Sequence, residues 1–409
     1  LFSQEFIEEY HNNMDSNPDR YPDTDWYDEV LTGNKLMQNH YFTFNGGTEK
    51  ARVLAGIGYL DQNGIMPNAN FERYTLRINT DLNLSKSFSA QIDANLKQSY
   101  MNQPSRGANN AIHWAMRIPA NQGGQLSNGL WGEGWNGDNP IAFVNEGGLN
   151  TQEEPELNLN LVLDYKPAEW ISVMVAYSPN YWQTNSSTFV KAIQTYQWDG
   201  SESYKSPQIS TLNTSHSRNL YNNYRSTITL DKSFSNHAFK LLAGFQQESY
   251  RNDRLSGYRE GFPFPDYPVL NAGGENIQIA NGEASETSLQ SVFGRLNYNY
   301  SEKYLFEANL RYDGSSRFAT GRKWGVFPSF SAGWRISEEL FFESIKNVVN
   351  NLKLRASWGQ LGNQLIGSSY PFSSQVDLGL SYVFNKQIAN GAGLTTMANS
   401  EISWEKTTI

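Results

Sequence analysis

Apolar and polar residues alternate along most of the chain from about residue 40 onward. In one clear segment Tyr74, Leu76 and Ile78 share one face, while Arg77 and Asn79 share the other. A β-strand produces this pattern because its successive side chains point to opposite faces. The pattern recurs in segments 88–96, 157–163, 171–177, 224–230, 239–245, 304–312 and 352–358. We expect about 13 strands of about 9–13 residues, a length that suits tilted strands crossing a bilayer.

The connections between these segments alternate between short and long. Short turns are expected near 46–50, 85–87, 166–169, 232–237 and 301–302, and long connections near 61–70, 99–155, 181–218, 251–287, 314–326 and 361–400. In an up-and-down barrel, odd and even connections lie at opposite ends, and outer-membrane barrels combine short periplasmic turns with long external loops. The pattern predicts an all-β fold, a transmembrane antiparallel up-and-down β-barrel. Residues 338–351 form a longer turn on the short side, with a brief helix expected at 338–342.

The chain is expected to divide into two parts. Residues 1–38 contain a short helical segment and a polar stretch with Pro18 and Pro22, and we interpret them as a linker that enters the barrel. Residues 39–409 are the partial transmembrane barrel, with long extracellular loops near 99–155, 181–218, 251–287 and 361–400. An odd number of strands leaves open edges, and unpaired backbone groups facing lipid cost several kcal/mol each. We therefore expect an internal piece of a longer protein.

Composition limits the classes of function. Mean hydropathy is −0.60 and we find no run of 18 apolar residues, so no transmembrane helix is expected. A barrel strand shows lipid only every second residue, so a low mean hydropathy is compatible with a membrane. The net charge of −9 makes a nucleic-acid partner unexpected, because phosphate binding needs clustered Lys and Arg.

Candidate chemistry is sparse. The chain has no Cys, which excludes a disulfide framework and thiolate metal sites. Its five His residues show no pair with ligand spacing, so we expect neither a metal site nor a cofactor. We find no nucleophile-elbow motif, assign no catalytic residue and expect no enzyme activity.

The long connections contain aromatic residues that could stack on the faces of sugar rings. The first connection, 99–155, is rich in Gly, Asn and Trp, and the second is 181–218. We name six candidate ligand-binding residues: Trp114, Trp131, Trp135, Trp182, Tyr196 and Trp198. Two other interpretations stay open, namely a loop that folds on its own aromatic residues and an interface with a partner protein.

The strongest motifs lie in the second half of the chain. Segments 311–318 and 323–334 read RYDGSSRF and KWGVFPSFSAGW, segment 352–363 reads LKLRASWGQLGN, and residues 23–26, 45–50, 58–65 and 404–407 add weaker matches. Together they resemble the SusC/RagA family of TonB-linked outer-membrane proteins of Bacteroidota. Asp-Gly is a strong turn signal, so we expect a structural role for the family-motif residues. These are Asp313, Gly314, Ser315, Ser316, Arg317, Phe318, Trp324, Gly325, Pro328, Ser329, Gly333 and Trp334.

The resemblance implies a barrel of about 22 strands in the bacterial outer membrane, filled by an N-terminal plug. It implies active import of an oligosaccharide or peptide, with a SusD-like surface lipoprotein as partner and energy from TonB-ExbB-ExbD. By the same resemblance, we expect the plug, the TonB box and the last strands to be missing from this sequence. Two alternatives stay open, a passive porin or structural barrel and a soluble β-rich glycan-binding module or adhesin. Outer-membrane lipid is the expected surrounding of the barrel.

Overall fold

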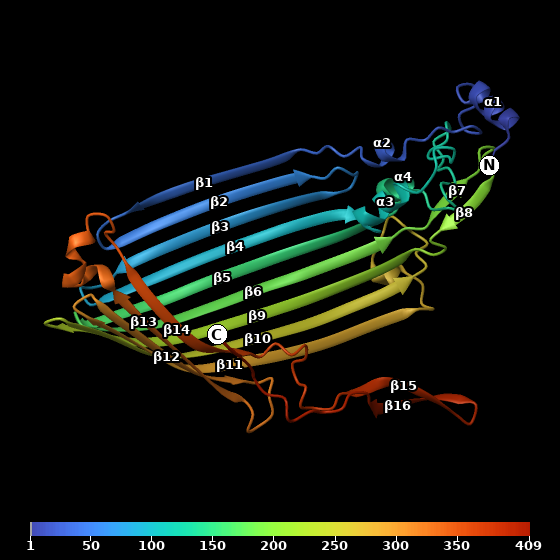
Figure 1. Cartoon of the computed structure of the whole chain (residues 1–409). Helices are drawn as coiled ribbons and strands as arrows, with labels where there is room; N and C mark the ends of the chain where they lie inside the picture. The colour runs from blue at the N-terminus through green and yellow to red at the C-terminus, as the bar shows by residue number, and fades with distance from the viewer. Residues whose placement is uncertain (1) are drawn as a thin grey trace.

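A computed structural model describes residues 2–409, and one curved antiparallel sheet of 13 strands makes up most of it (Figure 1). In spatial order its strands are β1 (Met37–Gly47), β2 (Ala51–Asn63), β3 (Asn70–Asn83), β4 (Phe88–Pro104), β5 (Leu149–Ala168), β6 (Ile171–Val190), β9 (Thr211–Phe234), β10 (His237–Glu260), β11 (Gln278–Tyr300), β12 (Tyr304–Ser315), β13 (Trp324–Arg335), β14 (Lys353–Asn363) and β17 (Glu405–Thr408). Each strand pairs with the sheet strand before it in sequence. The predicted up-and-down sheet of about 13 strands is confirmed.

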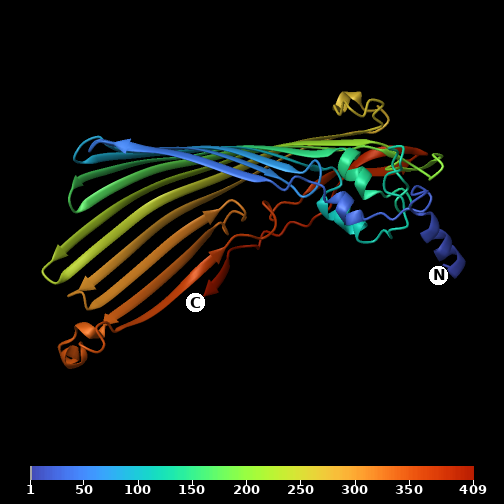
Figure 2. The ribbon, with the colours of Figure 1, turned by 90° about the horizontal axis from the view of Figure 1, so that it is seen from above.

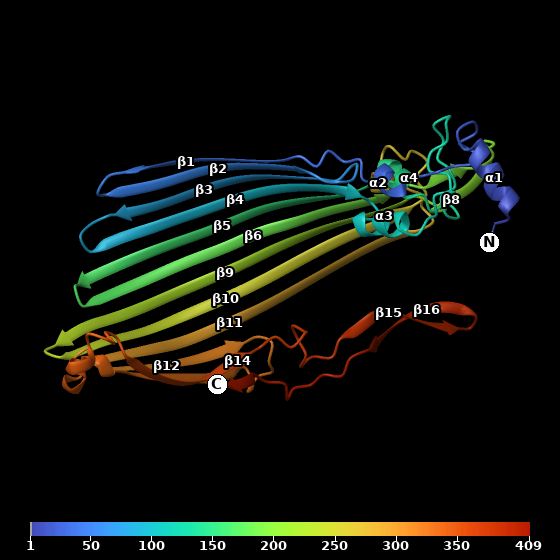
Figure 3. The ribbon, with the colours of Figure 1, turned by 45° about the horizontal axis from the view of Figure 1, so that its top comes forward.

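The remaining elements lie outside this sheet. Two small hairpins are formed by β7 (Ile193–Tyr196) with β8 (Glu202–Ser206) and by β15 (Val376–Phe384) with β16 (Gln387–Leu394). The helices are α1 (Gln4–Asn13), α2 (Trp26–Val30), α3 (Ala108–Ala115) and α4 (Pro140–Glu146), with short 3-10 turns η1 (Leu270–Ala272), η2 (Ile336–Glu338) and η3 (Leu340–Ile345). Figure 3 shows the β15–β16 hairpin standing apart from the main sheet. Within residues 2–409, no helix is long and apolar enough to cross a bilayer.

Short and long connections are sorted to opposite ends of the sheet, as predicted (Figure 1). The short end has turns at 48–50, 84–87, 169–170, 235–236 and 301–303, and the long end has connections at 64–69, 105–148, 191–210, 261–277, 316–323 and 364–404. The segment 336–352 is a long turn at the short end, and η2 and η3 confirm the helical character expected there. The sheet is open, because β1 and β17 stand at its two ends and do not pair with each other.

Several strands are longer than predicted. The alternation indicated about 9–13 residues, whereas β5 and β6 have 20 residues, β9 and β10 have 24, and β11 has 23. The extra length lies at the long-loop end, where both faces of a strand such as β9 carry polar residues. Backbone pairing continues there although the hydrophobic alternation has stopped. The connections expected at 99–155, 181–218 and 251–287 are correspondingly shorter.

One face of the sheet is apolar and open to its surroundings. Cross-strand partners share a face, and one such row joins Ile57, Leu76 and Leu96, which are 61%, 37% and 42% exposed. A second row on the same face joins four strands through Phe245, Val292, Tyr312 and Val326. Among the described residues, no second sheet or helical layer covers these side chains. The predicted outward-facing apolar band is confirmed.

The apolar face is the convex one. A Cβ on Gly257, which shares the face of Phe245, would lie 2.8 Å from a methyl group of Leu270 in η1. Figure 2 shows the gold turn that contains η1 on the convex side of the sheet, and helices α2 to α4 on the concave side. The concave face therefore carries the alternate, polar residues.

Candidate functional site

Polar side chains are hydrogen-bonded to one another across the concave face. Asn79 donates to Asp93 at 2.7 Å, and Gln91 and Asn160 donate to the other Asp93 oxygen at 2.8 and 3.1 Å. Ser178 continues the network by donating to Asn160 at 2.8 Å. One carboxylate thus collects donors from β3, β4 and β5, and the network reaches β6. Its polar groups have protein partners, as buried or half-buried polar groups require, and the surface remains compatible with water.

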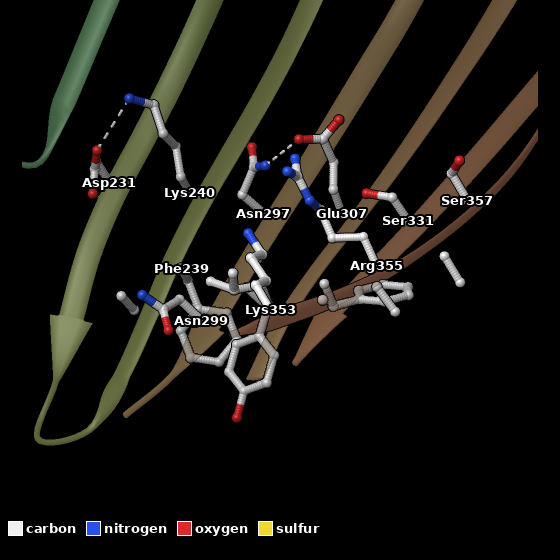
Figure 4. Close-up of a pocket in the computed structure, with 17 residues that line it drawn as sticks. Asp231, Phe239, Lys240, Asn297, Asn299, Glu307, Ser331, Lys353, Arg355 and Ser357 are labelled. Carbon is white, nitrogen blue, oxygen red and sulfur yellow. Dashed lines mark hydrogen bonds and ion pairs between the residues drawn. The ribbon is translucent and has the colours of Figure 1, made fainter. Parts of the chain in front are cut away.

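A second polar row crosses six strands near the short turns. Lys240 pairs with Asp231 at 3.3 Å, and Asn297 donates to Glu307 at 2.5 Å. Figure 4 shows Lys240, Asn297, Glu307 and Arg355 around one hollow of the concave face. The cross-strand row consists of Asp231, Lys240, Asn297, Glu307, Ser331 and Ser357. This wall presents charges of both signs to the interior.

At the long-loop end, three separate segments share one apolar core. The indole N–H of Trp26 in α2 donates to the Pro119 carbonyl at 3.2 Å, and Trp26 is only 3% exposed. The core combines residues from before β1, from the β2–β3 connection and from the β4–β5 connection: Trp26, Val30, Met66, Ala111, Ala115, Ile118, Ile141 and Val144. The β4–β5 connection is therefore a packed structure and not an open loop.

Asn139 holds the backbone of this connection together. Its side chain is fully buried, and its amide donates to the carbonyls of Gly124 at 2.6 Å and Gly132 at 2.9 Å. Its carbonyl oxygen accepts from the N–H of Ala142 at 3.1 Å and so caps α4. One side chain therefore satisfies three backbone groups that need partners when they are removed from water.

Arg106 joins two of the long connections. Its guanidinium lies 3.6 Å from the ring centroid of Phe143 and 3.3 Å from both Asp138 and Ser206. Burial lowers the pKa of Arg106, and the charge of Asp138 opposes that shift. The guanidinium stays ionised because its ordinary pKa is far above neutral. Segments 105–148 and 191–210 are thus fastened by a charged contact in addition to their apolar packing.

The six candidate aromatic residues fall into different environments. Trp114 and Trp131 pack against the apolar core, and the Trp131 carbonyl accepts from the backbone N–H of Tyr196 at 2.8 Å. Trp182 lies on the concave face, where its ring stacks 5.9 Å from a tyrosine ring of β10. Trp135 and Trp198 are 47% and 49% exposed. Trp135 and Trp198 are therefore about half open to the surroundings, and the Arg20 guanidinium lies 4.9 Å from the ring centroid of Trp198.

Several exposed aromatic residues at this end were absent from the sequence prediction, and Tyr204 is one of them. Tyr204 is 44% exposed in β8 and lies directly against Gly137, whose φ of +89° places it in the left-handed region. The prediction selected two tryptophans and one tyrosine from the second connection, and Tyr204 lies in that same connection. Its contact with Gly137 joins residues far apart in sequence, so no local pattern indicated it.

A protein-family model described as TonB dependent receptor-like, beta-barrel, matches residues 113–408. The chain belongs to this family of TonB-dependent receptor barrels. The receptor barrel is accordingly a protein of the bacterial outer membrane, as the sequence predicted, and the soluble alternative is excluded. Across residues 2–409, no group of three His, Asp or Glu side chains could hold a metal ion.

Curated relatives extend the match to nearly the whole chain. The TonB-dependent receptor SusC of Bacteroides thetaiotaomicron is 28% identical over 428 residues, which cover 94% of this chain and 40% of SusC. TonB-dependent receptor P3 of Formosa agariphila is 27% identical over 394 residues, covering 93% of this chain and 38% of that protein. The receptor barrel thus spans about two fifths of the length of these relatives. The predicted resemblance to SusC is confirmed.

A solved structure confirms the fold. The RagAB peptide importer in its closed-closed state superposes with a TM-score of 0.78 at 20% identity, covering 99% of this chain and 46% of that one. At this identity the likeness establishes the barrel architecture and nothing about the solute.

Glycines among the family-motif residues make room for aromatic rings at the β12–β13 connection of the receptor barrel. The rings of Tyr312 and Trp324 stack at 4.6 Å, and a Cβ on Gly314 would lie 2.7 Å from the Trp324 ring. A Cβ on Gly325 would lie 2.6 Å from the ring of Phe327. Both positions favour glycine because a larger residue would displace a packed ring.

The rest of the first motif joins this connection to the segment before β17. Phe318 has no exposed surface, and its ring centroid is 5.4 Å from that of Trp404. Arg317 donates to the Ser368 carbonyl at 2.9 Å, and its own backbone N–H donates to Ser315 at 3.1 Å. In the same connection the backbone N–H of Ser316 donates to the Ser288 carbonyl at 2.9 Å. Within β12, Asp313 pairs with Arg311 at 3.1 Å.

The second motif lies along β13. Pro328 stands opposite Leu310 on the apolar face, while Ser329 and Gly333 lie on the concave face. The indole N–H of Trp334 donates to Glu339 at 3.0 Å in the turn that follows. All of these contacts join residues of this chain to one another.

Proposed function

We propose that this chain is part of a SusC-type importer that moves an oligosaccharide or a peptide across the outer membrane. The observation that carries the proposal is the two-sided wall of a TonB-dependent receptor barrel. Its convex face is apolar and open, and its concave face is lined by hydrogen-bonded polar groups. Such a wall separates hydrocarbon from a wet interior through which a polar solute could pass.

The proposed mechanism needs no covalent chemistry. The solute would bind at the long-loop end, and TonB-ExbB-ExbD would move a plug that fills the barrel. The relatives are receptors and not enzymes, so the proposal assigns no catalytic residue and no cofactor. In the same proposal, residues 1–38 are the linker that enters the barrel, and the packing of Trp26 in the loop core favours entry at the long-loop end. Residues 39–409 are then the barrel itself, with its long loops outside the cell.

We further propose that a SusD-like surface lipoprotein covers the long-loop end. Trp135 and Trp198 are the aromatic residues best placed to meet a solute or this lid, because about half of each side chain is exposed. Trp182 and Tyr196 are candidates of lower exposure, and Trp114 and Trp131 serve the core. The family-motif residues have the structural role expected of them, a proposal that their internal contacts support.

The test is uptake by cells that carry the full-length receptor. Labelled oligosaccharides and labelled peptides are offered to cells with the gene, without it, and with the gene but without TonB. One of the two solute classes should accumulate only when both the receptor and TonB are present. Uptake that requires the receptor but persists without TonB would support the passive porin instead.

The same assay tests the exposed tryptophans. The double substitution W135A/W198A removes two half-exposed indoles, and ring packing of an aromatic side chain contributes about 0.5–1.5 kcal/mol in addition to its buried area. We expect uptake at low solute concentration to fall about tenfold. The matched control is W170A, which removes an equally exposed tryptophan at a short turn. Equal uptake by W135A/W198A and W170A would contradict solute or lid contact at these residues.

A further inference from the structure

The turn between β13 and β14 differs from the other connections at the short end. It spans residues 336–352, whereas its neighbours at 235–236 and 301–303 are tight turns. Phe341, Ile345 and Val348 recur with the spacing of an amphipathic helix, and residues Leu340–Ile345 form a 3-10 helix. The apolar set is Leu340, Phe341, Phe342, Ile345, Val348 and Val349, and the polar set between them is Glu343, Ser344, Lys346 and Asn347. Figure 1 shows this turn in orange at the short end of the sheet.

Most of the apolar set has no protein neighbour to cover it among the described residues. Phe342 is only 5% exposed and so faces the protein. Phe341 is 67% exposed, Ile345 48% and Val348 87%. Contiguous apolar side chains of this kind in contact with water are rare, and they mark an interaction surface.

The turn is continuous with the lipid-facing side of the barrel. Tyr304 and Trp334 stand opposite each other on the convex face, and both donate to Glu339 of the turn, at 2.7 and 3.0 Å. The ring centroid of Phe341 lies 6.4 Å from that of Trp334. The same convex row continues through aromatic and imidazole rings, and aromatic rings are typical of a membrane interface. This short-end girdle consists of Phe234, His237, Tyr300, Tyr304 and Trp334.

We propose that residues 340–349 are an amphipathic anchor that lies in the phospholipid of the periplasmic leaflet, an assignment of leaflet that rests on the proposed function, in which the long loops are outside the cell. Phe341, Ile345 and Val348 enter the boundary between headgroups and acyl chains, as the apolar face of an interfacial helix does. Glu343 and Lys346 remain at headgroup level, and Lys346 is oriented by an ion pair with Glu338 at 3.2 Å. Lipid is the occupant because the apolar stripe extends the lipid-facing band without a break.

Fluorescence quenching of a single label tests the anchor. The 409 residues contain no Cys, so V348C in an otherwise cysteine-free full-length receptor gives one site for a bimane label. The receptor is placed in phosphatidylcholine vesicles with or without brominated acyl chains. We expect bromine to quench the V348C label about twofold and added iodide to quench it weakly, because the label lies among acyl chains. The label on E343C, five residues away, is expected to be quenched strongly by iodide and weakly by bromine.

Two outcomes would overturn the anchor. Equal iodide quenching of V348C and E343C would place Val348 in water. Protection of V348C from both quenchers would place it against a protein. The variant I345C repeats the measurement at a second apolar position, so a local effect of one substitution cannot decide the result.

Discussion

Asn139 shows how much of the loop end depends on single side chains. Its buried amide bonds two carbonyls and its oxygen caps α4. From the sequence, Asn139 was one asparagine in a loop rich in them, and nothing local distinguished it.

The tryptophans were easier to select and harder to interpret, because Trp114 and Trp131 pack against a core assembled from segments far apart in the chain. Side-chain burial of this kind is decided by tertiary packing, which a local pattern does not contain.

The substitution N139A should loosen the β4–β5 connection. Loss of the cap and of two buried hydrogen bonds is expected to cost about 2–4 kcal/mol of local stability. Hydrogen exchange or limited proteolysis within 105–148 would report the change, while the strands remain protected. N145A is the matched control, because Asn145 also lies in α4 but is exposed and makes one such bond there. Equal effects of the two substitutions would contradict this role of Asn139.

At the scale of elements, the alternation predicted which segments form strands but not where they end. Leu241 and Phe245 made β10 visible in the sequence, while residues 251–260 continue the same strand without regular apolar alternation. The hydrophobic pattern reports contact with lipid, and a strand that leaves the lipid keeps its backbone pairing without that signal. The brief helix predicted at 338–342 corresponds to the 3-10 turns η2 and η3. Its attachment to the girdle through Glu339 was not visible, because Tyr304 and Trp334 meet that residue only in the folded sheet.

The turn 336–352 should become less stable in acid. Hydrogen bonds from Tyr304 first, and then from Trp334, hold the pKa of Glu339 below its usual 4.5, and Lys303 adds to this effect. A lowered pKa in the folded state means that this contribution is present above pH 4.5 and is lost as the pH falls through the lower folded value. Hydrogen exchange in the turn, corrected for intrinsic rates, should therefore quicken below about pH 4.5.

The control for this pH dependence is E339Q, which keeps an acceptor but carries no charge to titrate. Its turn should exchange faster than wild type at neutral pH and show no further step in acid. An acid step of wild-type size in E339Q would assign the titration to another group.

At the scale of the whole molecule, the sequence predicted an antiparallel up-and-down sheet with two unlike faces. These follow from period-2 alternation and from the sorting of connections, both of which are local in sequence. The apolar core that joins α2 to the β4–β5 connection could not be predicted, because it depends on how distant loops meet at one end of the sheet. The family likeness supplies the architecture that these local signals only outline.

Adjacent residues of β10 offer a direct test of the two faces. Leu241 is 46% exposed on the convex face, and Leu242 points to the concave face. A lysine facing the middle of a bilayer costs about 2–4 kcal/mol. We expect L241K to lower the free energy of unfolding of the full-length receptor in vesicles by that amount and L242K to lower it by less than about 1 kcal/mol. A larger loss in L242K than in L241K would reverse the assignment of lipid and water.

The length of β9 and β10 determines how far the sheet extends beyond the membrane. Twenty-four residues extend for about 80 Å along a strand, or about 60 Å along the membrane normal at a tilt near 40°. Hydrocarbon accounts for about 25 Å of that height. The remaining strand length places the tips of β9 and β10 about 35 Å beyond the hydrocarbon. Connections carried on these tips are therefore held at a distance from the membrane surface.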